Sequence, residues 1–140
     1  MPDFITEVKD FSEINTSPVV VEFYSSRCSA CKNFEDTYEE AAKNHPDINF
    51  YRINIFEKDR DGQMPGMEQG TKCGIRSLPT LLGFTDQINC DEDHERMYGK
   101  QSKEELEKWI EQIELSSKIE EQQKEEINKN SIKRHKHRRG

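Results

Sequence analysis

The spacing of hydrophobic residues predicts alternating strands and helices in the part of the chain that precedes residue 117. Val19 to Tyr24 is a β-branched and aromatic run typical of a buried strand, with Glu22 as its polar interruption. The segment from about Ser29 to Asn44 is expected to be a helix, because its apolar side chains recur at the helical period. Ile48 to Phe56 alternates in the manner of a second strand. Together these segments predict a β-α-β unit.

The segments around this unit carry weaker patterns. Phe4 to Val8 predicts an edge strand, and Asp10 to Asn15 predicts a short helix. Glu57 to Thr71 is charged and contains proline and several glycines. We therefore expect a long loop there, with at most a short helical turn.

The next part of the pattern predicts a hairpin followed by a helix. Leu78 to Phe84 has the composition of a strand, and after the polar turn Thr85 to Glu95 the short run Arg96 to Tyr98 can return antiparallel to it. Ser102 and Glu105 form a capping box before an apolar helical face. The fold class is therefore α/β, with a central mixed β-sheet flanked by helices.

Composition separates this domain from the end of the chain. Of 140 residues only 31% are hydrophobic, and 28 acidic residues outnumber 21 basic ones, giving a net charge of -7. No acidic residue follows Glu126, whereas five basic side chains crowd into residues 133–139. We expect a folded domain over residues 1–115 and a charged extension over residues 116–140, partly helical or disordered, with a basic terminus.

These charges and patterns exclude some functions and leave others open. The acidic body argues against broad nucleic-acid binding by the domain, although residues 133–139 could contact nucleic acid non-specifically or bind an acidic partner. No apolar run is long enough to span a bilayer, and the first residues do not resemble a signal peptide. We therefore expect no membrane association and a cytoplasmic location, with a virus particle or the nucleus as alternatives.

Two cysteines form a C-x-x-C motif between the predicted strand and helix. Cys28 would lie at the helix N-terminus, where free backbone N–H groups and the helix dipole favour a thiolate, and Cys31 would lie one turn inward. Thiol–disulfide exchange requires such an exposed attacking thiolate and a nearby resolving thiol. Zinc binding is the alternative, but no second cysteine or histidine pair has ligand spacing, so we expect no metal or other cofactor.

Three segments resemble a thioredoxin domain: Val19 to Lys32, Cys73 to Thr80, and Tyr98 to Ile113. The resemblance covers residues 4–115 and implies a thioredoxin fold. It also implies a monomeric protein dithiol–disulfide oxidoreductase, with Cys28 as nucleophile and Cys31 as resolving thiol. The partners implied are client proteins that contain disulfides or dithiols, together with an electron donor or acceptor that the sequence does not identify.

The buried carboxylate and the proline are the other catalytic features of the pattern. Burial of Glu22 would raise its pKa and let it exchange a proton with Cys31, unless its carboxylate reaches the surface at the end of the sheet. In carrying a glutamate at this position, the chain resembles protein disulfide isomerases. In the family the proline matched by Pro79 is cis and faces the cysteines, so that Leu78 would offer backbone contacts to a client. The alternative is a structural trans proline at a strand edge.

Several residues depart from the thioredoxin pattern. Arg27 replaces a tryptophan and places a cation beside Cys28, where it should stabilise the thiolate and change the surface that binds clients, or else points into solvent. Ser29-Ala30 replaces the usual dipeptide between the cysteines. Arg52 matches a lysine near the buried carboxylate and could pair with Glu22. We expect a redox potential less reducing than the value of about -270 mV for thioredoxin. Alternatives are a disulfide oxidase or isomerase on the same fold, and a non-catalytic binding or scaffold module that uses long loops and the basic end.

The remaining cysteines are expected to stay outside the exchange reaction. Cys73 matches an extra cysteine of some thioredoxins and is expected to be a free, partly buried thiol, with a regulatory or intermolecular disulfide as the alternative. Cys90 lies in a polar, acidic turn, so we expect it to be exposed and a poor nucleophile. The segments Glu57 to Lys72 and Thr85 to Met97 are longer than in the thioredoxin pattern.

Overall fold

The computed structural model describes residues 4–91, 95–99 and 101–138, with side chains described as far as residue 127. Within these residues a five-stranded sheet has the order β1-β3-β2-β4-β5. Its strands are β1 (Ile5–Glu7), β2 (Val19–Tyr24), β3 (Asn49–Asn54), β4 (Thr80–Phe84) and β5 (Glu95–Tyr98). β3 runs parallel to β1 and β2, whereas β4 runs antiparallel to β2 and β5. The sheet is therefore mixed, as expected for a thioredoxin fold.

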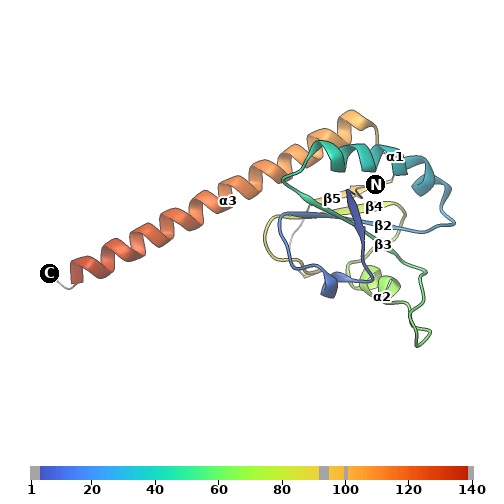
Figure 1. Cartoon of the computed structure of the whole chain (residues 1–140), viewed down its shortest axis with the longest axis horizontal. Coiled ribbons are helices and arrows are strands. Elements are labelled where there is room, and N and C mark those ends of the chain that lie inside the picture. Colours follow the sequence, from blue (N-terminus) through green and yellow to red (C-terminus); the bar gives the residue numbers. More distant parts are fainter. Residues whose placement is uncertain (1–3, 92–94, 100, 139–140) are drawn as a thin grey trace.

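Helices cover both faces of this sheet (Figure 1). The helix α1 (Ser29–Asn44) and the first part of α3 (Lys103–Arg138) lie on one face, and the 3-10 helix η1 (Phe11–Glu13) and α2 (Pro65–Lys72) lie on the other. Every residue of β2 is buried, because alternate side chains enter the two cores. Val20 packs in the α1 and α3 core, while Val19, Val21 and Phe23 pack in the core beneath α2.

A buried histidine joins the two helices of the first face. His45 is the C-cap of α1, and its two ring nitrogens contact the carboxylates of Glu107 and Glu114 on α3, at 2.7 Å for Nδ1 to Glu114 Oε1. Burial by itself lowers the pKa of His45, but the two carboxylates outweigh burial and raise it. A neutral imidazole has only one N–H, so the protonated ring satisfies both carboxylates best.

The prediction of a loop over residues 57–71 was wrong in its second half, where α2 forms. Pro65 occupies the first turn of this helix, a position that tolerates its missing N–H. Gly66 and Gly70 are buried, and a Cβ atom at Gly66 would collide with the backbone of Asn54 and the side chain of Ile53. Close packing against β3 therefore stabilises a segment whose own helix propensity is low.

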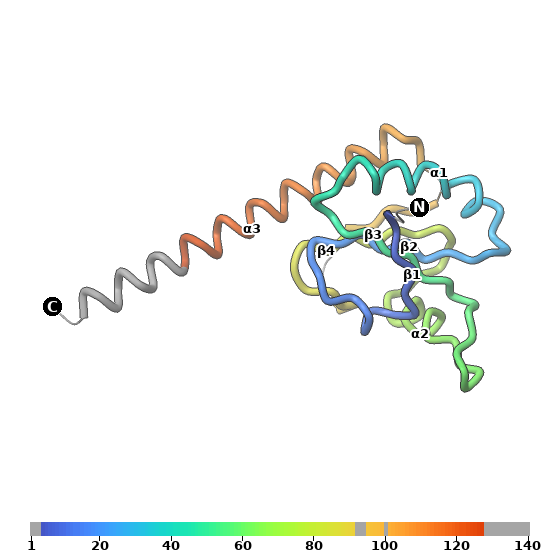
Figure 2. The backbone as a smooth tube through the Cα atoms, viewed as in Figure 1, coloured from blue at the N-terminus to red at the C-terminus, as the bar shows by residue number. Residues whose placement is uncertain are grey.

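The final helix is continuous across the expected boundary between residues 115 and 116, and it extends away from the body of the domain (Figures 1 and 2). Beyond residue 115 it contacts the turn after β4: Thr85 Oγ1 donates to Glu120 Oε1 at 2.9 Å, and Lys124 Nζ lies 2.9 Å from Asp86 Oδ2. Residues 133–139 lie outside the residues whose side chains are described. None of the described helices is long and apolar enough to cross a bilayer.

Candidate active site

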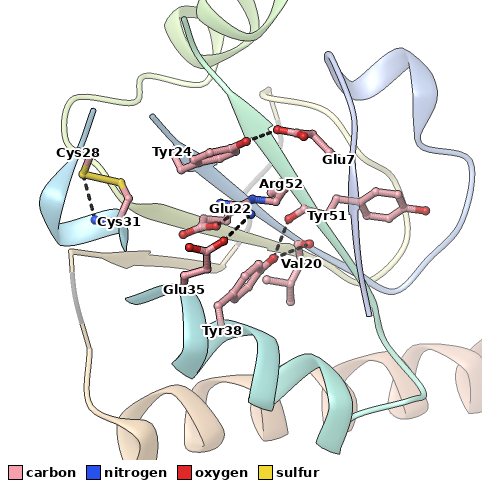
Figure 3. Close-up of polar contacts among 10 residues, drawn as sticks. All are labelled: Glu7, Val20, Glu22, Tyr24, Cys28, Cys31, Glu35, Tyr38, Tyr51 and Arg52. Carbon is pink, nitrogen blue, oxygen red and sulfur yellow. Dashed lines mark hydrogen bonds and ion pairs between the residues drawn. A yellow bond between two sulfur atoms is a disulfide. The ribbon is translucent and has the colours of Figure 1, made fainter. Parts of the chain in front are cut away.

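Cys28 and Cys31 form a disulfide at the start of α1. Cys28 is the N-cap of the helix, where its Sγ accepts the N–H of Cys31 at 3.1 Å (Figure 3). Cys31 is 3% exposed, whereas Cys28 is partly exposed. The accessible sulfur of Cys28 thus lies at the positive end of the helix dipole and accepts a backbone hydrogen bond. Both interactions favour a thiolate once the disulfide opens.

The segment before β4 faces this disulfide. The Leu78–Pro79 peptide bond is cis, and the carbonyl oxygen of Leu78 lies 3.7 Å from Cys28 Sγ. Leu78 is partly exposed, while Pro79 is buried and its carbonyl accepts the N–H of Gly99 at 2.8 Å. The structure therefore places the carbonyl oxygen of Leu78 beside Cys28 Sγ, and the bond that follows it to Pro79 is cis rather than trans.

Glu22 is a buried carboxylic acid in the centre of the sheet. It is 1% exposed, its Oε2 atom has no hydrogen-bond partner, and Arg52 lies opposite it on β3 with Nε 3.8 Å from Oε1. Burial raises the pKa of Glu22 from 4.5 to about 7; the charge of Arg52 lowers it and that of Glu35 raises it further. The carboxylate does not reach the surface, and the expected pairing with Arg52 is present.

Two other groups near Glu22, the Tyr24 ring and the Glu35 carboxylate, hold Arg52 in place. Its guanidinium carbon lies 3.8 Å from the centroid of the Tyr24 ring, and its Nη1 donates to Glu35 Oε1 at 3.2 Å. The Tyr24 hydroxyl in turn donates to Glu7. Burial, and then the hydrogen bond to Glu7, raise the pKa of Tyr24. Stacking on an aromatic ring fixes the cation near the buried acid and limits its movement.

Tyr24 and Glu35 were not identified as site residues from the sequence. Glu35 lies four residues after Cys31 on α1, so the helical period places it on the same face, and this spacing was the available signal. The role of Tyr24 depends on the pairing of β2 with β3, which no local pattern indicates. Figure 3 shows both side chains gathered with Arg52 around Glu22.

A pocket of about 230 Å³ opens beside Cys31. It is lined by Cys31, Lys32, Glu35 and Arg52, together with residues 24–26 at the end of β2. The buried cysteine and the cation that pairs with Glu22 thus border the same space, and the space is large enough for water. The pocket therefore opens Cys31 and Arg52 to solvent, and Arg52 is the residue that pairs with Glu22.

The three departures around the cysteines lie at the edge of the site. The Arg27 side chain is exposed, and its backbone N–H donates to Ser25 Oγ at 3.2 Å. Ser29 is exposed and Ala30 is partly exposed in the first turn of α1. These three residues surround the accessible sulfur without covering it.

The expectation of a free thiol at Cys73 was wrong, because Cys73 and Cys90 form a second disulfide with Cα atoms 4.6 Å apart. Cys90 is partly buried rather than exposed. The pairing joins residues separated by 17 positions, and the folding of the turn after β4 over the α2 face brings them together. Among the described residues, no cluster of three or more histidine, cysteine, aspartate or glutamate side chains has an arrangement that could hold a metal ion.

Comparison with known proteins places these features in one family. The thioredoxin family model matches residues 3–112. The Streptomyces coelicolor protein designated thioredoxin 2 is 34% identical over 70 residues, which are 50% of this chain and 46% of that protein. A thioredoxin-like protein of Acanthamoeba polyphaga mimivirus is 29% identical over 82 residues, 59% of this chain and 53% of that protein. The chain thus spans about half the length of these two relatives.

The solved structures agree on the fold. Oxidised thioredoxin O2 from Arabidopsis thaliana superposes with a TM-score of 0.60 at 20% identity, covering 80% of this chain and 96% of that one. The likeness at this identity concerns the fold, and the family assignment rests on the match over residues 3–112. This chain belongs to the thioredoxin family.

Proposed function

We propose that this protein exchanges disulfides with client proteins through the Cys28 and Cys31 pair. The observation that carries the proposal is the position of Cys28, an accessible helix N-cap sulfur 3.7 Å from the carbonyl of Leu78, next to a cis proline. Membership in the thioredoxin family supports disulfide oxidoreductase chemistry in general. The clients and the electron donor or acceptor are proteins or thiols that these residues do not identify.

In the reductive direction, the Cys28 thiolate attacks one sulfur of a client disulfide. A Cys28–client disulfide forms, the client S–S bond breaks, and the other client sulfur leaves as a thiolate that takes a proton from solvent. The extended client lies along Leu78 and Pro79, where the backbone next to Cys28 orients the disulfide for attack.

Resolution uses Cys31 and the buried acid. Glu22 accepts the proton of the Cys31 thiol, by way of water in the pocket that borders Cys31 and Arg52. The Cys31 thiolate then attacks Cys28 Sγ, closes the Cys28–Cys31 bond and releases the second client sulfur, so that two electrons have passed to the client. An acid with a pKa of about 7 can take and return this proton near neutral pH.

Reduction of insulin disulfides in the presence of dithiothreitol tests this proposal. We expect the wild type to accelerate the precipitation of insulin chains and Cys28→Ser to lose the acceleration. Asn33→Ala, an exposed position on α1 outside the C-x-x-C motif, is the control and should retain it. Activity that persists in Cys28→Ser would contradict the assignment of the nucleophile.

A disulfide oxidase or isomerase is the second candidate, favoured by the exposed cation at Arg27 and by the glutamate at position 22. A cation near Cys28 stabilises the thiolate, and a stabilised dithiol form makes the disulfide more oxidising. Equilibration with glutathione measures the redox potential of the Cys28–Cys31 couple and distinguishes the two candidate functions. A potential near or above about -180 mV supports the oxidase or isomerase, whereas one near about -270 mV supports a reductase.

A further inference from the structure

The second disulfide lies on the face of the sheet opposite α1. Cys73 is the C-cap of α2 and is 2% exposed, while Cys90 lies in the turn after β4. Both belong to the core cluster that also contains Val21 and Phe23 of β2, whereas α1 packs against the other core. The sheet therefore separates this pair from Cys28 and Cys31.

The two disulfides are similar in burial, because the more buried cysteine of each pair, Cys31 or Cys73, is 3% or 2% exposed. They differ in their electrostatic surroundings. Cys28 lies at the N-terminal, positive end of α1, whereas Cys73 lies at the C-terminal, negative end of α2. Cys90 is followed directly by Asp91. Exchange proceeds through thiolates as attacking and leaving groups, so the surroundings that promote exchange at the first pair oppose it at the second.

Neighbouring polar groups fix the second pair in place. Gln69 accepts the backbone N–H of Phe11 at 3.0 Å, and this contact directs its amide nitrogen to within 3.2 Å of Cys90 Sγ. The Arg96 guanidinium donates to the carbonyl oxygen of Cys73. The residues around this disulfide thus come from four segments: α2, η1, β5 and the turn after β4.

The cross-link stands at the start of the segment that presents Leu78 to Cys28. The Ile75 N–H donates to Gly70 O at 2.8 Å, and Ile75 and Leu78 pack against the same core cluster as Cys73. Five residues after Cys73, the Leu78 carbonyl reaches Cys28 Sγ. A constraint at Cys73 therefore limits how far residues 73–79 can move away from the active site.

We propose that Cys73–Cys90 is a non-catalytic cross-link that a disulfide donor closes once. It stays closed while the Cys28–Cys31 bond opens and closes. By staying closed, it holds residues 73–79 in position for client exchange. The last part of this proposal rests on the proposed function. A closed pair that is retained through each cycle would keep residues 73–79 in the same position whether Cys28 and Cys31 are oxidised or reduced.

Closure of the pair requires an oxidant of the disulfide class, such as glutathione disulfide. The Cys90 thiolate, the more accessible of the two, attacks one glutathione sulfur and releases the other glutathione as a thiolate. The Cys73 thiolate then attacks Cys90 Sγ, forms the Cys73–Cys90 bond and displaces the second glutathione. The two cysteine protons end on two glutathione thiols, and two electrons pass to the donor.

Differential labelling of the full chain tests the persistence of the cross-link. Oxidised protein is treated with graded dithiothreitol, acid-quenched, alkylated with N-ethylmaleimide and mapped by peptide mass spectrometry. We expect Cys28 and Cys31 to be labelled at about tenfold or more lower reductant than Cys73 and Cys90. In guanidinium the difference should collapse, because it depends on the folded surroundings. Labelling of the second pair at equal or lower reductant, or its recovery as free thiols, would overturn the proposal.

The functional part is tested with Cys90→Ser, with Gln87→Ser in the same turn as the control. We expect kcat/KM for insulin reduction to fall about tenfold or more in Cys90→Ser and to be unchanged in Gln87→Ser, because residues 73–79 lose their anchor. A folded Cys90→Ser with wild-type kcat/KM overturns the positioning role. The labelling experiment uses the unmodified chain, so it decides persistence even if the variant does not fold. A wild type inactive toward insulin would count against the proposed function instead.

Discussion

Replacing Glu22 with glutamine is expected to stabilise the oxidised protein at alkaline pH and to have little effect at acidic pH. Glu22 is 1% exposed, and burial raises its pKa from 4.5 to about 7. Because the pKa is higher in the folded protein, the stability linked to this group is fully present below pH 4.5 and is lost as the pH rises through 7. The shift corresponds to about 3 kcal/mol once the carboxyl is ionised in both states.

Urea unfolding of both proteins, with their disulfides closed, measures this difference directly. At about pH 9 the variant should exceed the wild type by up to about 3 kcal/mol in unfolding free energy, and at about pH 4 the two should nearly coincide. Glu39→Gln, an exposed position on α1, is the matched control and should show no such pH dependence. An equal difference between wild type and Glu22→Gln at both pH values would refute the assignment of a buried, ionisable acid.

Three further substitutions address single contacts. Arg52→Met removes the cation that lowers the pKa of Glu22, so the carboxyl should titrate at higher pH than in the wild type in a ¹³C NMR titration; an unchanged midpoint would contradict the pairing. His45→Gln should destabilise the protein by about 2 kcal/mol at low pH. Because the pKa of His45 is raised, this loss is full below pH 6.5 and shrinks as the pH rises through the folded value, and urea unfolding that shows a pH-independent loss would exclude a charged histidine. Gly83→Ala places a Cβ atom against the side chain of Ile113 and should lower the urea midpoint by an amount equivalent to about 1–3 kcal/mol, whereas an unchanged midpoint would show that α3 shifts without cost.

The parts of the fold that follow local patterns were predictable from the sequence. The strand Val19–Tyr24 and the helix Ser29–Asn44 have the predicted bounds, because each has a strong hydrophobic period and clear end signals. The C-x-x-C motif falls at their junction, so the helix N-cap position of Cys28 followed from the same two segments. The resemblance then supplied the cis geometry at Pro79, which no pattern in the residues indicates.

The parts that depend on distant packing were not predictable in this way. α2 has two buried glycines, and its helix is stabilised by contact with β3 rather than by its own composition. The Cys73–Cys90 bond joins a helix end to a turn 17 residues later, a pairing that cysteine spacing alone does not specify. The contacts of the His45 ring with Glu107 and Glu114 form only when α1 and α3 pack together, because the two carboxylates lie on α3.

The central claim is that Cys28 is the sulfur that bonds to the client, and trapping of the mixed disulfide tests it most directly. Cys31→Ser is first treated with mild reductant, so that Cys28 is a free thiol, and then with a peptide that contains one intramolecular disulfide. The product is mapped by mass spectrometry. The structure predicts an adduct of one peptide per chain, joined to Cys28, because that sulfur is accessible and lies beside Leu78. An adduct joined to Cys90, or no adduct at all, would contradict the account.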